Sequence, residues 1–386
     1  MTRTESKFTS VEICAGAGGQ AVGLHKAGFQ HLALIEIDDY ACATLELNVT
    51  GNAEWDGCKV LQRDLTKFKV DELGLKPGDL DLLAGGVPCP PFSAAGKQLG
   101  EDDERDLFPD MLRMVETLLP KAVMIENVRG LLEPPEKFSR YREEVIERRL
   151  HEAGYVKCYW KILEACDYGV PQLRPRAILV AMRKEYAEHF AWTEPETRPL
   201  LTVAEALAPS MRKRYEDSGD PRWESFYQRW LTEARKGVVA PTLVGGSKKH
   251  GGADLGPTRA KEAWRKLGVC GLGVANEPED LKDAERDLFA ERGPKLTVKQ
   301  AAIIQGFPTD WKFAGRKTAA YRQVGNAFPP PVAQAVGEQI IAALEKGTKA
   351  LAAAQSDTLF EIPAPSAPVR AELGDGRGDR ECAAVS

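Results

Sequence analysis

The chain has 386 residues, of which 43% are hydrophobic and 28% charged, so it is long enough for two domains and ordinary in composition for a globular protein. Its net charge of −5 argues against a protein that coats nucleic acid, and no apolar run is long enough to span a membrane. The polar N-terminus lacks a signal-peptide core and the eight cysteines form no Cys-x-x-Cys pair, so we expect a cytoplasmic chain without a metal site or a disulfide framework.

The first predicted strand, residues 11–14, runs into the glycine-rich turn Ala15-Gly16-Ala17-Gly18-Gly19 and then into a helix that ends at Gly28. This order is typical of a nucleotide-binding βαβ unit, because glycines let the backbone approach a ligand and the helix amino end favours negative charge. The second strand, residues 32–35, ends at Glu36, where a carboxylate can accept hydrogen bonds from both ribose hydroxyls. We therefore expect a cofactor that contains adenosine.

Two more carboxylates lie close to the ends of predicted strands. Asp38 precedes a predicted helix, residues 40–47, and is interpreted as its cap. Asp64 lies in a third predicted strand, residues 60–65, where it could hold an exocyclic amine or be a solvated turn residue. The sequence leaves both readings of Asp64 open.

Cys89 follows a buried strand, residues 80–84, within the segment Gly85-Gly86-Val87-Pro88-Cys89-Pro90-Pro91. So many Gly and Pro residues exclude a helix or strand interior, which places Cys89 on a stiff loop at the edge where α/β sheets bind ligands. A lone cysteine is most often a small buried hydrophobe, but this loop presents its sulfur and so favours a nucleophile. Residues 93–106 have no apolar period and are interpreted as a mobile lid.

Glu126 ends the next buried strand, residues 122–125, which follows an amphipathic helix at 107–119. Parallel neighbouring strands would bring Glu126 to face Cys89. Partial burial raises the pKa of a carboxyl group, which would suit Glu126 to donate a proton. The alternative is a carboxylate paired with an arginine.

Gln172, Arg174 and Arg176 alternate in an extended segment, so they are expected to share one face. Two guanidiniums on one face favour a phosphate or a buried carboxylate, and solvated surface arginines are the alternative. A helix (138–150) and a strand (156–163) precede this segment, and a last strand (177–182) follows it. The fold class is therefore α/β, a Rossmann-like, doubly wound, mostly parallel sheet.

Residues 190–295 have little periodicity, many Pro and Gly residues and several tryptophans, which indicates a second, smaller domain, expected to span 187–317. Within 211–270, thirteen Lys and Arg stand against seven Asp and Glu, a local charge of +6 that leaves −11 elsewhere. A basic segment in an acidic chain indicates a polyanionic partner or a solvated loop. Predicted helices at 297–304 and 332–344 flank a rigid loop around Asn326. The first domain is expected to span 9–186 and 318–350, and the tail at 355–386 to be disordered.

Six segments, in this order and over residues 9–345, resemble the DNA (cytosine-5) methyltransferases of bacterial restriction–modification systems. They are Ala-Gly-x-Gly-Gly, Pro-Cys, Glu-Asn-Val, Gln-x-Arg-x-Arg, Gln-Gly-Phe-Pro and Gly-Asn-x-x-Pro-Pro-Pro-Val. The resemblance implies a fold that binds S-adenosylmethionine, with 187–317 as a target-recognition domain. The expected partner is double-stranded DNA, with a restriction endonuclease acting separately, and the chain is expected to be a monomer.

The resemblance also implies roles for single residues. The Cys89 thiolate adds to carbon 6 of a flipped-out cytosine, Glu126 stabilises protonation at ring nitrogen 3, and Arg174 and Arg176 favour the thiolate. The enamine takes the methyl group of S-adenosylmethionine, and elimination restores the ring. Implied cofactor-binding residues are Cys14, Ala15, Gly16, Ala17, Gly18, Gly19, Glu36, Ile37, Asp64, Leu65, Pro88, Asn326 and Ala327. Implied substrate-binding residues are Pro88, Asn127, Val128 and Gln172. Lys248 and Lys249, in the basic segment, are predicted to bind DNA phosphates.

This sequence departs from the family at two positions and leaves other functions open. The family usually has a Phe at the place of Cys14 and often an aromatic residue near Ile37, so the departures bear on cofactor affinity and not on cofactor identity. An NAD-dependent dehydrogenase would fit the glycine turn but gives no role to the Pro-Cys loop. A transfer-RNA methyltransferase of the same fold is a second alternative, although the basic segment favours duplex DNA. A DNA-binding module without activity is a third, and the presence of all the chemical residues speaks against it.

Overall fold

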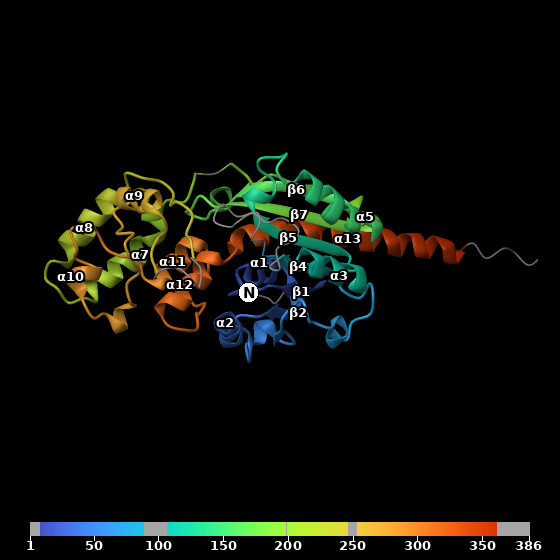
Figure 1. Cartoon of the computed structure of the whole chain (residues 1–386), viewed down its shortest axis with the longest axis horizontal. Coiled ribbons are helices and arrows are strands. Elements are labelled where there is room, and N and C mark those ends of the chain that lie inside the picture. Colours follow the sequence, from blue (N-terminus) through green and yellow to red (C-terminus); the bar gives the residue numbers. More distant parts are fainter. Residues whose placement is uncertain (1–7, 89–105, 198, 246–252, 361–386) are drawn as a thin grey trace, which may run out of the picture. The chain divides into compact units, whose positions relative to one another are not determined.

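Seven strands form one sheet in the order β3-β2-β1-β4-β5-β7-β6 in a computed structural model that describes residues 8–88, 106–197, 199–245 and 253–360 (Figure 1). The strands are β1 (Phe8–Ile13), β2 (Phe29–Glu36), β3 (Lys59–Gln62), β4 (Leu82–Gly86), β5 (Ala122–Val128), β6 (Tyr155–Glu164) and β7 (Pro175–Arg183). β1 to β5 pair in parallel, and the chain order reverses between β1 and β4. Ligands bind α/β sheets at the carboxyl edge beside such a reversal.

The last two strands depart from the parallel pattern, because β7 is antiparallel to both β5 and β6. Residues 165–174, which join β6 to β7, contain only the short helical turn Ala165–Tyr168, and so short a connection cannot cross over to a parallel strand. The predicted mostly parallel sheet is therefore confirmed, with this edge as its exception. The exception has a consequence for the site, because it places the amino end of β7 beside the carboxyl end of β5.

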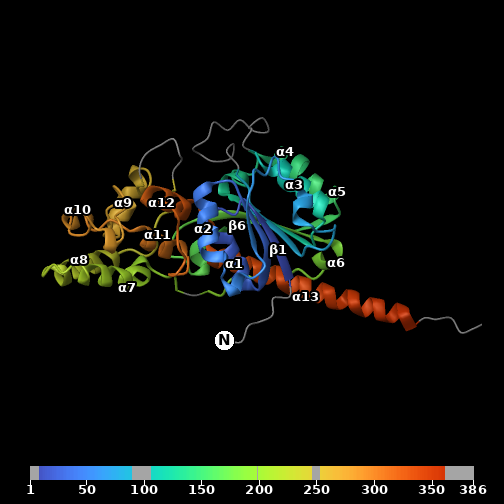
Figure 2. The ribbon, with the colours of Figure 1, turned by 90° about the horizontal axis from the view of Figure 1, so that it is seen from below.

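Helices lie on both faces of the sheet (Figure 2), and each face has an apolar core. The helices around the sheet are α1 (Gly19–Ala27), α2 (Asp39–Val49), α3 (Phe108–Leu118), α4 (Ser139–Tyr141), α5 (Arg148–Glu152), α6 (Lys184–Ala187) and α13 (Pro330–Phe360). Val11 and Ile13 of β1 share a core with α3, whereas Leu82 of β4 shares the other core with Val336 of α13. Since strand side chains alternate between faces, Glu12 points away from α3.

A further apolar core joins residues between Val203 and Ala327, apart from the cores of the sheet. Its helices are α7 (Val203–Glu216), α8 (Trp223–Ala234), α9 (Thr258–Lys266), α10 (Ala284–Asp287), α11 (Val298–Gln305) and α12 (Lys317–Asn326). The sequence predicted little regular structure before residue 297, although Thr202 and Glu205 form a capping box at the start of α7. The described residues as far as Thr348 form one compact unit, and those from Lys349 onwards are separate from it.

The C-terminal helix is longer than the sequence predicted. α13 continues to Phe360, past the expected start of the tail at residue 355, and residues 361–386 lie outside the described part of the chain. Among the described residues, no helix combines the length and hydropathy needed to cross a bilayer.

Candidate active site

A cavity of about 470 Å³ opens at the carboxyl edge of the sheet, beside the reversal between β1 and β4. Every residue predicted to bind the cofactor lines it, with the exception of Gly18. The predicted residues in its wall are Cys14, Ala15, Gly16, Ala17, Gly19, Glu36, Ile37, Asp64, Leu65, Pro88, Asn326, Ala327 and the predicted acid Glu126. Segments far apart in sequence thus meet around one space.

The glycine turn between β1 and α1 needs its glycines for two different reasons. Gly16 and Gly18 have positive φ angles of 53° and 85°, a region that side chains rarely adopt. Gly18 caps α1 and packs outward, since a Cβ there would lie 2.8 Å from the Trp311 ring. The Trp311 indole in turn donates to the Ala17 carbonyl at 3.0 Å. Gly18 therefore supports the turn from behind while Gly16 and Gly19 face the cavity.

Glu36 fixes the turn from the end of β2. One carboxylate oxygen accepts from Gly16 N at 2.7 Å, and the other accepts from Ile37 N at 2.8 Å and Asp38 N at 2.9 Å. A carboxylate offers about four lone-pair directions, so Glu36 keeps capacity for a ligand hydroxyl. Asp38 accepts from Tyr40 N and Ala41 N at the start of α2, as its interpretation as a cap requires.

Tyr40 is a cavity residue that the sequence reasoning did not find. Ile37 and Tyr40 both line the cavity, and their side chains are 60% and 49% exposed. Large apolar side chains left open beside a cavity offer contact to a flat ligand. Tyr40 thus supplies an aromatic ring near Ile37, where the sequence comparison with the family indicated that this chain lacks one. Tyr40 lies in the first turn of α2, two residues after the cap Asp38.

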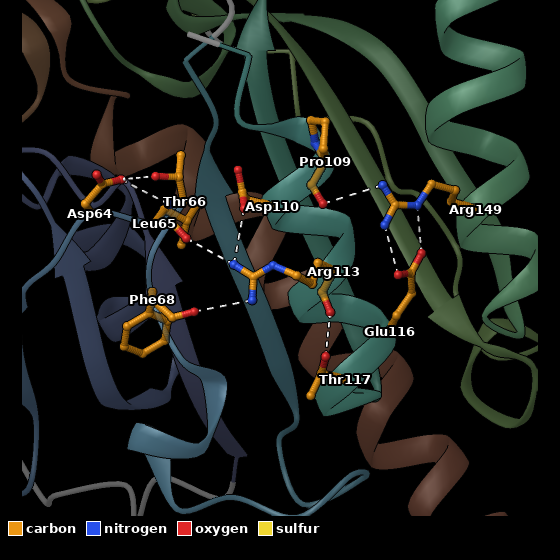
Figure 3. Close-up of polar contacts among 10 residues, drawn as sticks. All are labelled: Asp64, Leu65, Thr66, Phe68, Pro109, Asp110, Arg113, Glu116, Thr117 and Arg149. Carbon is orange, nitrogen blue, oxygen red and sulfur yellow. Dashed lines mark hydrogen bonds and ion pairs between the residues drawn. The ribbon is translucent and has the colours of Figure 1, made fainter. Parts of the chain in front are cut away.

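A second missed residue, Arg113 of α3, holds the loop that carries Asp64 and Leu65 (Figure 3). The Arg113 guanidinium donates to the carbonyls of Leu65 at 3.1 Å and Phe68 at 3.3 Å. Asp64 accepts from the hydroxyl and the backbone N–H of Thr66, and these hydrogen bonds lower the pKa of Asp64. The loop therefore presents a charged carboxylate to the cavity, from a turn that α3 holds in place.

Glu126 pairs with Arg176 where β5 and β7 run side by side. The Arg176 Nε lies 2.7 Å from Glu126 Oε1, and each side chain is 14% exposed. Glu126 is opposite Ile178, so Arg176 is its diagonal cross-strand neighbour. A Cβ on Gly86 would come within 2.9 Å of Glu126 Oε2, so Gly86 makes room for this oxygen at the end of β4. The sequence left open that Glu126 pairs with an arginine, and the structure shows this pairing.

Asn127 anchors the start of the Pro-Cys loop. Its side chain is 3% exposed and donates to the Val87 carbonyl at 3.0 Å, while its oxygen accepts from Val128 N at 2.8 Å. These bonds fix the backbone two residues before Cys89. Cys89 lies outside the described residues, as do Lys248 and Lys249, so their predicted roles stay predictions.

Arg174 and Gln172 are buried in a network that joins distant segments. Arg174 donates to the carbonyls of Leu243 at 2.8 Å, Gly325 at 2.9 Å and Ala327 at 2.9 Å, and burial lowers the pKa of its guanidinium. Gln172 accepts from Leu243 N at 2.7 Å. Both residues act here as positioning residues for the cavity wall rather than as solvated surface groups. The predicted effect of Arg174 on the Cys89 thiol remains a prediction.

Replacing Arg174 with methionine is expected to lower the free energy of unfolding by about 3–5 kcal/mol, because three buried carbonyls lose a charged donor. Urea unfolding followed by circular dichroism measures the change. Arg140→Met serves as the control, since Arg140 is 81% exposed and its pairing with Glu144 should contribute less than about 1 kcal/mol. Equal losses in the two variants would contradict the positioning role of Arg174.

Comparison with known proteins identifies the family. The profile of the C-5 cytosine-specific DNA methylases matches residues 8–342. The Type II methyltransferase M.NaeI of Lentzea aerocolonigenes is 49% identical over 339 residues, which cover 86% of this chain and 75% of the relative. M.NgoMIV of Neisseria gonorrhoeae is 48% identical over 345 residues, 88% of this chain and 99% of the relative. The structure of the Entamoeba histolytica methyltransferase EhMeth shares the fold, with a TM-score of 0.56 at 15% identity over 87% of this chain and 98% of that one.

Proposed function

Since the chain belongs to the C-5 cytosine-specific DNA methylase family and is a DNA (cytosine-5) methyltransferase, we propose that its cavity binds S-adenosylmethionine and that Cys89 attacks the cytosine beside it. One observation carries the proposal. Glu126, the predicted acid, lines the same cavity as Glu36 and the glycine turn. Groups suited to a nucleoside and a group suited to a cytosine ring thus share one space. The family match does not favour a dehydrogenase.

The residues in the cavity fit S-adenosylmethionine. Glu36 keeps free acceptor capacity for a ribose hydroxyl, and Asp64 presents a carboxylate that can accept from an exocyclic amine. Tyr40 and Ile37 offer apolar contact to a flat base. Carboxylates also suit a ligand with a positive charge. When bound, S-adenosylmethionine supplies an activated methyl group.

The chain's own residues would activate the cytosine. The target base must leave the duplex stack, which costs about 3 kcal/mol in lost stacking and pairing. The Cys89 sulfur then forms a bond to carbon 6, and the ring π electrons move towards carbon 5, which becomes nucleophilic. Glu126 holds a proton at ring nitrogen 3, and Arg176 fixes the carboxyl group through Oε1 while Oε2 remains available. After methylation, loss of the carbon 5 proton releases the sulfur and restores the aromatic ring.

Duplex DNA would be held by residues 187–317, which we propose as the target-recognition domain. An apolar core that joins residues from Val203 to Ala327, and so includes most of this region, supports this assignment. Lys248 and Lys249 are proposed phosphate contacts, on the basis of the local positive charge in the sequence. The named relatives are Type II methyltransferases, so we also propose that this chain works beside a cognate restriction endonuclease, as a monomer in the cytoplasm.

Bisulfite sequencing of DNA from a host that expresses the protein tests the proposed substrate. We expect cytosines resistant to conversion at one short recurring sequence, and none in the same host carrying an empty vector. The same treatment of transfer RNA should reveal no resistant position. Resistance confined to transfer RNA would replace duplex DNA with RNA as the substrate.

A further inference from the structure

An arginine without a partner lies in the wall of the cavity. Arg322 of α12 lines the cavity together with Ala319 and Asn326, which share its face of the helix. The Arg322 Nε is buried and has no hydrogen-bond partner among the described residues. No ion pair joins its guanidinium to a carboxylate in the described part of the chain. A half-buried charge without a partner costs free energy, which an anionic ligand would recover.

The other arginine of the cavity wall is already paired within the protein. The Arg63 Nε donates to Glu72 at 3.0 Å, and its Nη1 donates to the Gln62 carbonyl at 3.0 Å. Arg63 therefore has structural partners that account for its position, whereas the described residues supply none for the guanidinium of Arg322.

The turn of α12 that carries Arg322 also contacts the proposed target-recognition domain. A Cβ on Gly245 would lie 2.4 Å from the Arg322 carbonyl oxygen and 2.4 Å from Asn326 Oδ1, so only a glycine can approach α12 this closely. Arg174 fixes the approach, because it donates to the carbonyl of Leu243, two residues earlier. Arg322 thus belongs both to the cavity wall and to the turn against which residues 243–245 pack.

The DNA can supply the missing anion. A nucleotide that leaves the duplex stack brings its flanking phosphates to the mouth of the cavity. Gly245 precedes Lys248 and Lys249, the proposed phosphate contacts, by three and four residues in the sequence. A guanidinium presents its donors in a planar fork that suits phosphate oxygens. The contact with Gly245 therefore favours a DNA phosphate over the carboxylate of the cofactor.

We propose that Arg322 binds a phosphate that flanks the flipped-out cytosine. The side chain would then hold the target nucleotide against the same helix whose Asn326 faces the cavity. Arg322 is assigned here to the DNA and not to the cofactor. This inference rests on the proposed binding of duplex DNA with the target base in the cavity.

The salt dependence of DNA binding tests the assignment in the full chain. The probe is a duplex that contains the site found by bisulfite sequencing, titrated by fluorescence anisotropy between about 50 and 200 mM salt. Arg322→Met should weaken binding about 10–100-fold, as expected for a lost hydrogen-bonded charge contact, and reduce the slope of log K against log salt by about 0.9. Its affinity for S-adenosylhomocysteine, the demethylated cofactor, should change less than about threefold. Its melting temperature should not fall, because methionine keeps the apolar stem and removes an unpaired nitrogen.

Arg212→Met is the matched control, because Arg212 of α7 is 61% exposed and pairs with Glu216. This variant should keep both the DNA affinity and the salt slope of the wild type. Unchanged DNA affinity and slope in Arg322→Met, or a loss of S-adenosylhomocysteine affinity in their place, would overturn the assignment to phosphate.

A neutral methylphosphonate on either side of the target cytosine locates the contact. At one of the two positions, the wild type should lose about as much affinity as Arg322→Met loses on the natural duplex, and Arg322→Met should lose no more. Losses that add at both positions would place the contact of Arg322 elsewhere and contradict the inference. If the wild type binds neither the duplex nor S-adenosylhomocysteine, the proposed function itself fails.

Discussion

Cys89→Ala is expected to lower the rate of methyl transfer at least about 10⁴-fold, because removing a nucleophile that forms a covalent intermediate abolishes the pathway rather than slowing one step. DNA affinity should stay within about threefold of the wild type, since most protein–DNA affinity comes from phosphate contacts that this sulfur does not make. Incorporation of a labelled methyl group into duplex DNA measures the first quantity, and a filter-binding or anisotropy titration measures the second.

The control for Cys89 is a cysteine far from the cavity. Cys158 lies in β6 and is partly exposed, so Cys158→Ala should keep wild-type turnover. Duplexes that carry 5-fluorocytosine at a methylated site provide a direct test, because fluorine blocks the final elimination and traps the sulfur–carbon bond. Peptide mapping should locate the link at position 89. Turnover by Cys89→Ala within tenfold of the wild type would remove this residue from the mechanism.

The sequence predicted the parts of the site that depend on local order. An apolar run followed by a polar residue predicted where a strand reaches the cavity. Glu36, the last residue of β2, and Glu126, two residues before the end of β5, both line it. The glycine turn could also be predicted from local sequence, because the positive φ angles at Gly16 and Gly18 favour glycine. The family and the α/β sheet were both predicted and are confirmed by the comparisons.

Partnerships between distant segments could not be predicted. The acceptors of Arg174 come from Leu243, Gly325 and Ala327, and no spacing within Gln-x-Arg-x-Arg encodes carbonyls so far along the chain. The direction of β7 was missed because the short link before it was not weighed against a crossover. By contrast, the Thr202-x-x-Glu205 signal for α7 was present in the sequence and was overlooked.

The ion pair between Glu126 and Arg176 allows catalysis to be separated from folding. Glutamine has nearly the shape of glutamate and keeps an oxygen for Arg176, so Glu126→Gln should fold with near wild-type stability. It cannot lend a charge or a proton to ring nitrogen 3, and loss of such a positioned group typically lowers rates about 10²–10⁴-fold. We therefore expect a kcat reduced by that factor, measured at saturating DNA and cofactor.

Arg176→Met removes the other partner of the ion pair and should mainly lower stability, whereas Glu126→Gln should mainly lower turnover. It leaves the Glu126 carboxylate unpaired at 14% exposure, and breaking a buried pair from one side destabilises proteins by about 3–5 kcal/mol. If the pair serves folding alone, Glu126→Gln should turn over normally once it is folded, and only Arg176→Met should be impaired. If Glu126 also acts on the ring, trapping by 5-fluorocytosine should be slower in Glu126→Gln although its melting temperature is unchanged. A slow, stable Glu126→Gln variant beside an unstable Arg176→Met variant therefore assigns the chemistry to the carboxyl group and the support to the guanidinium.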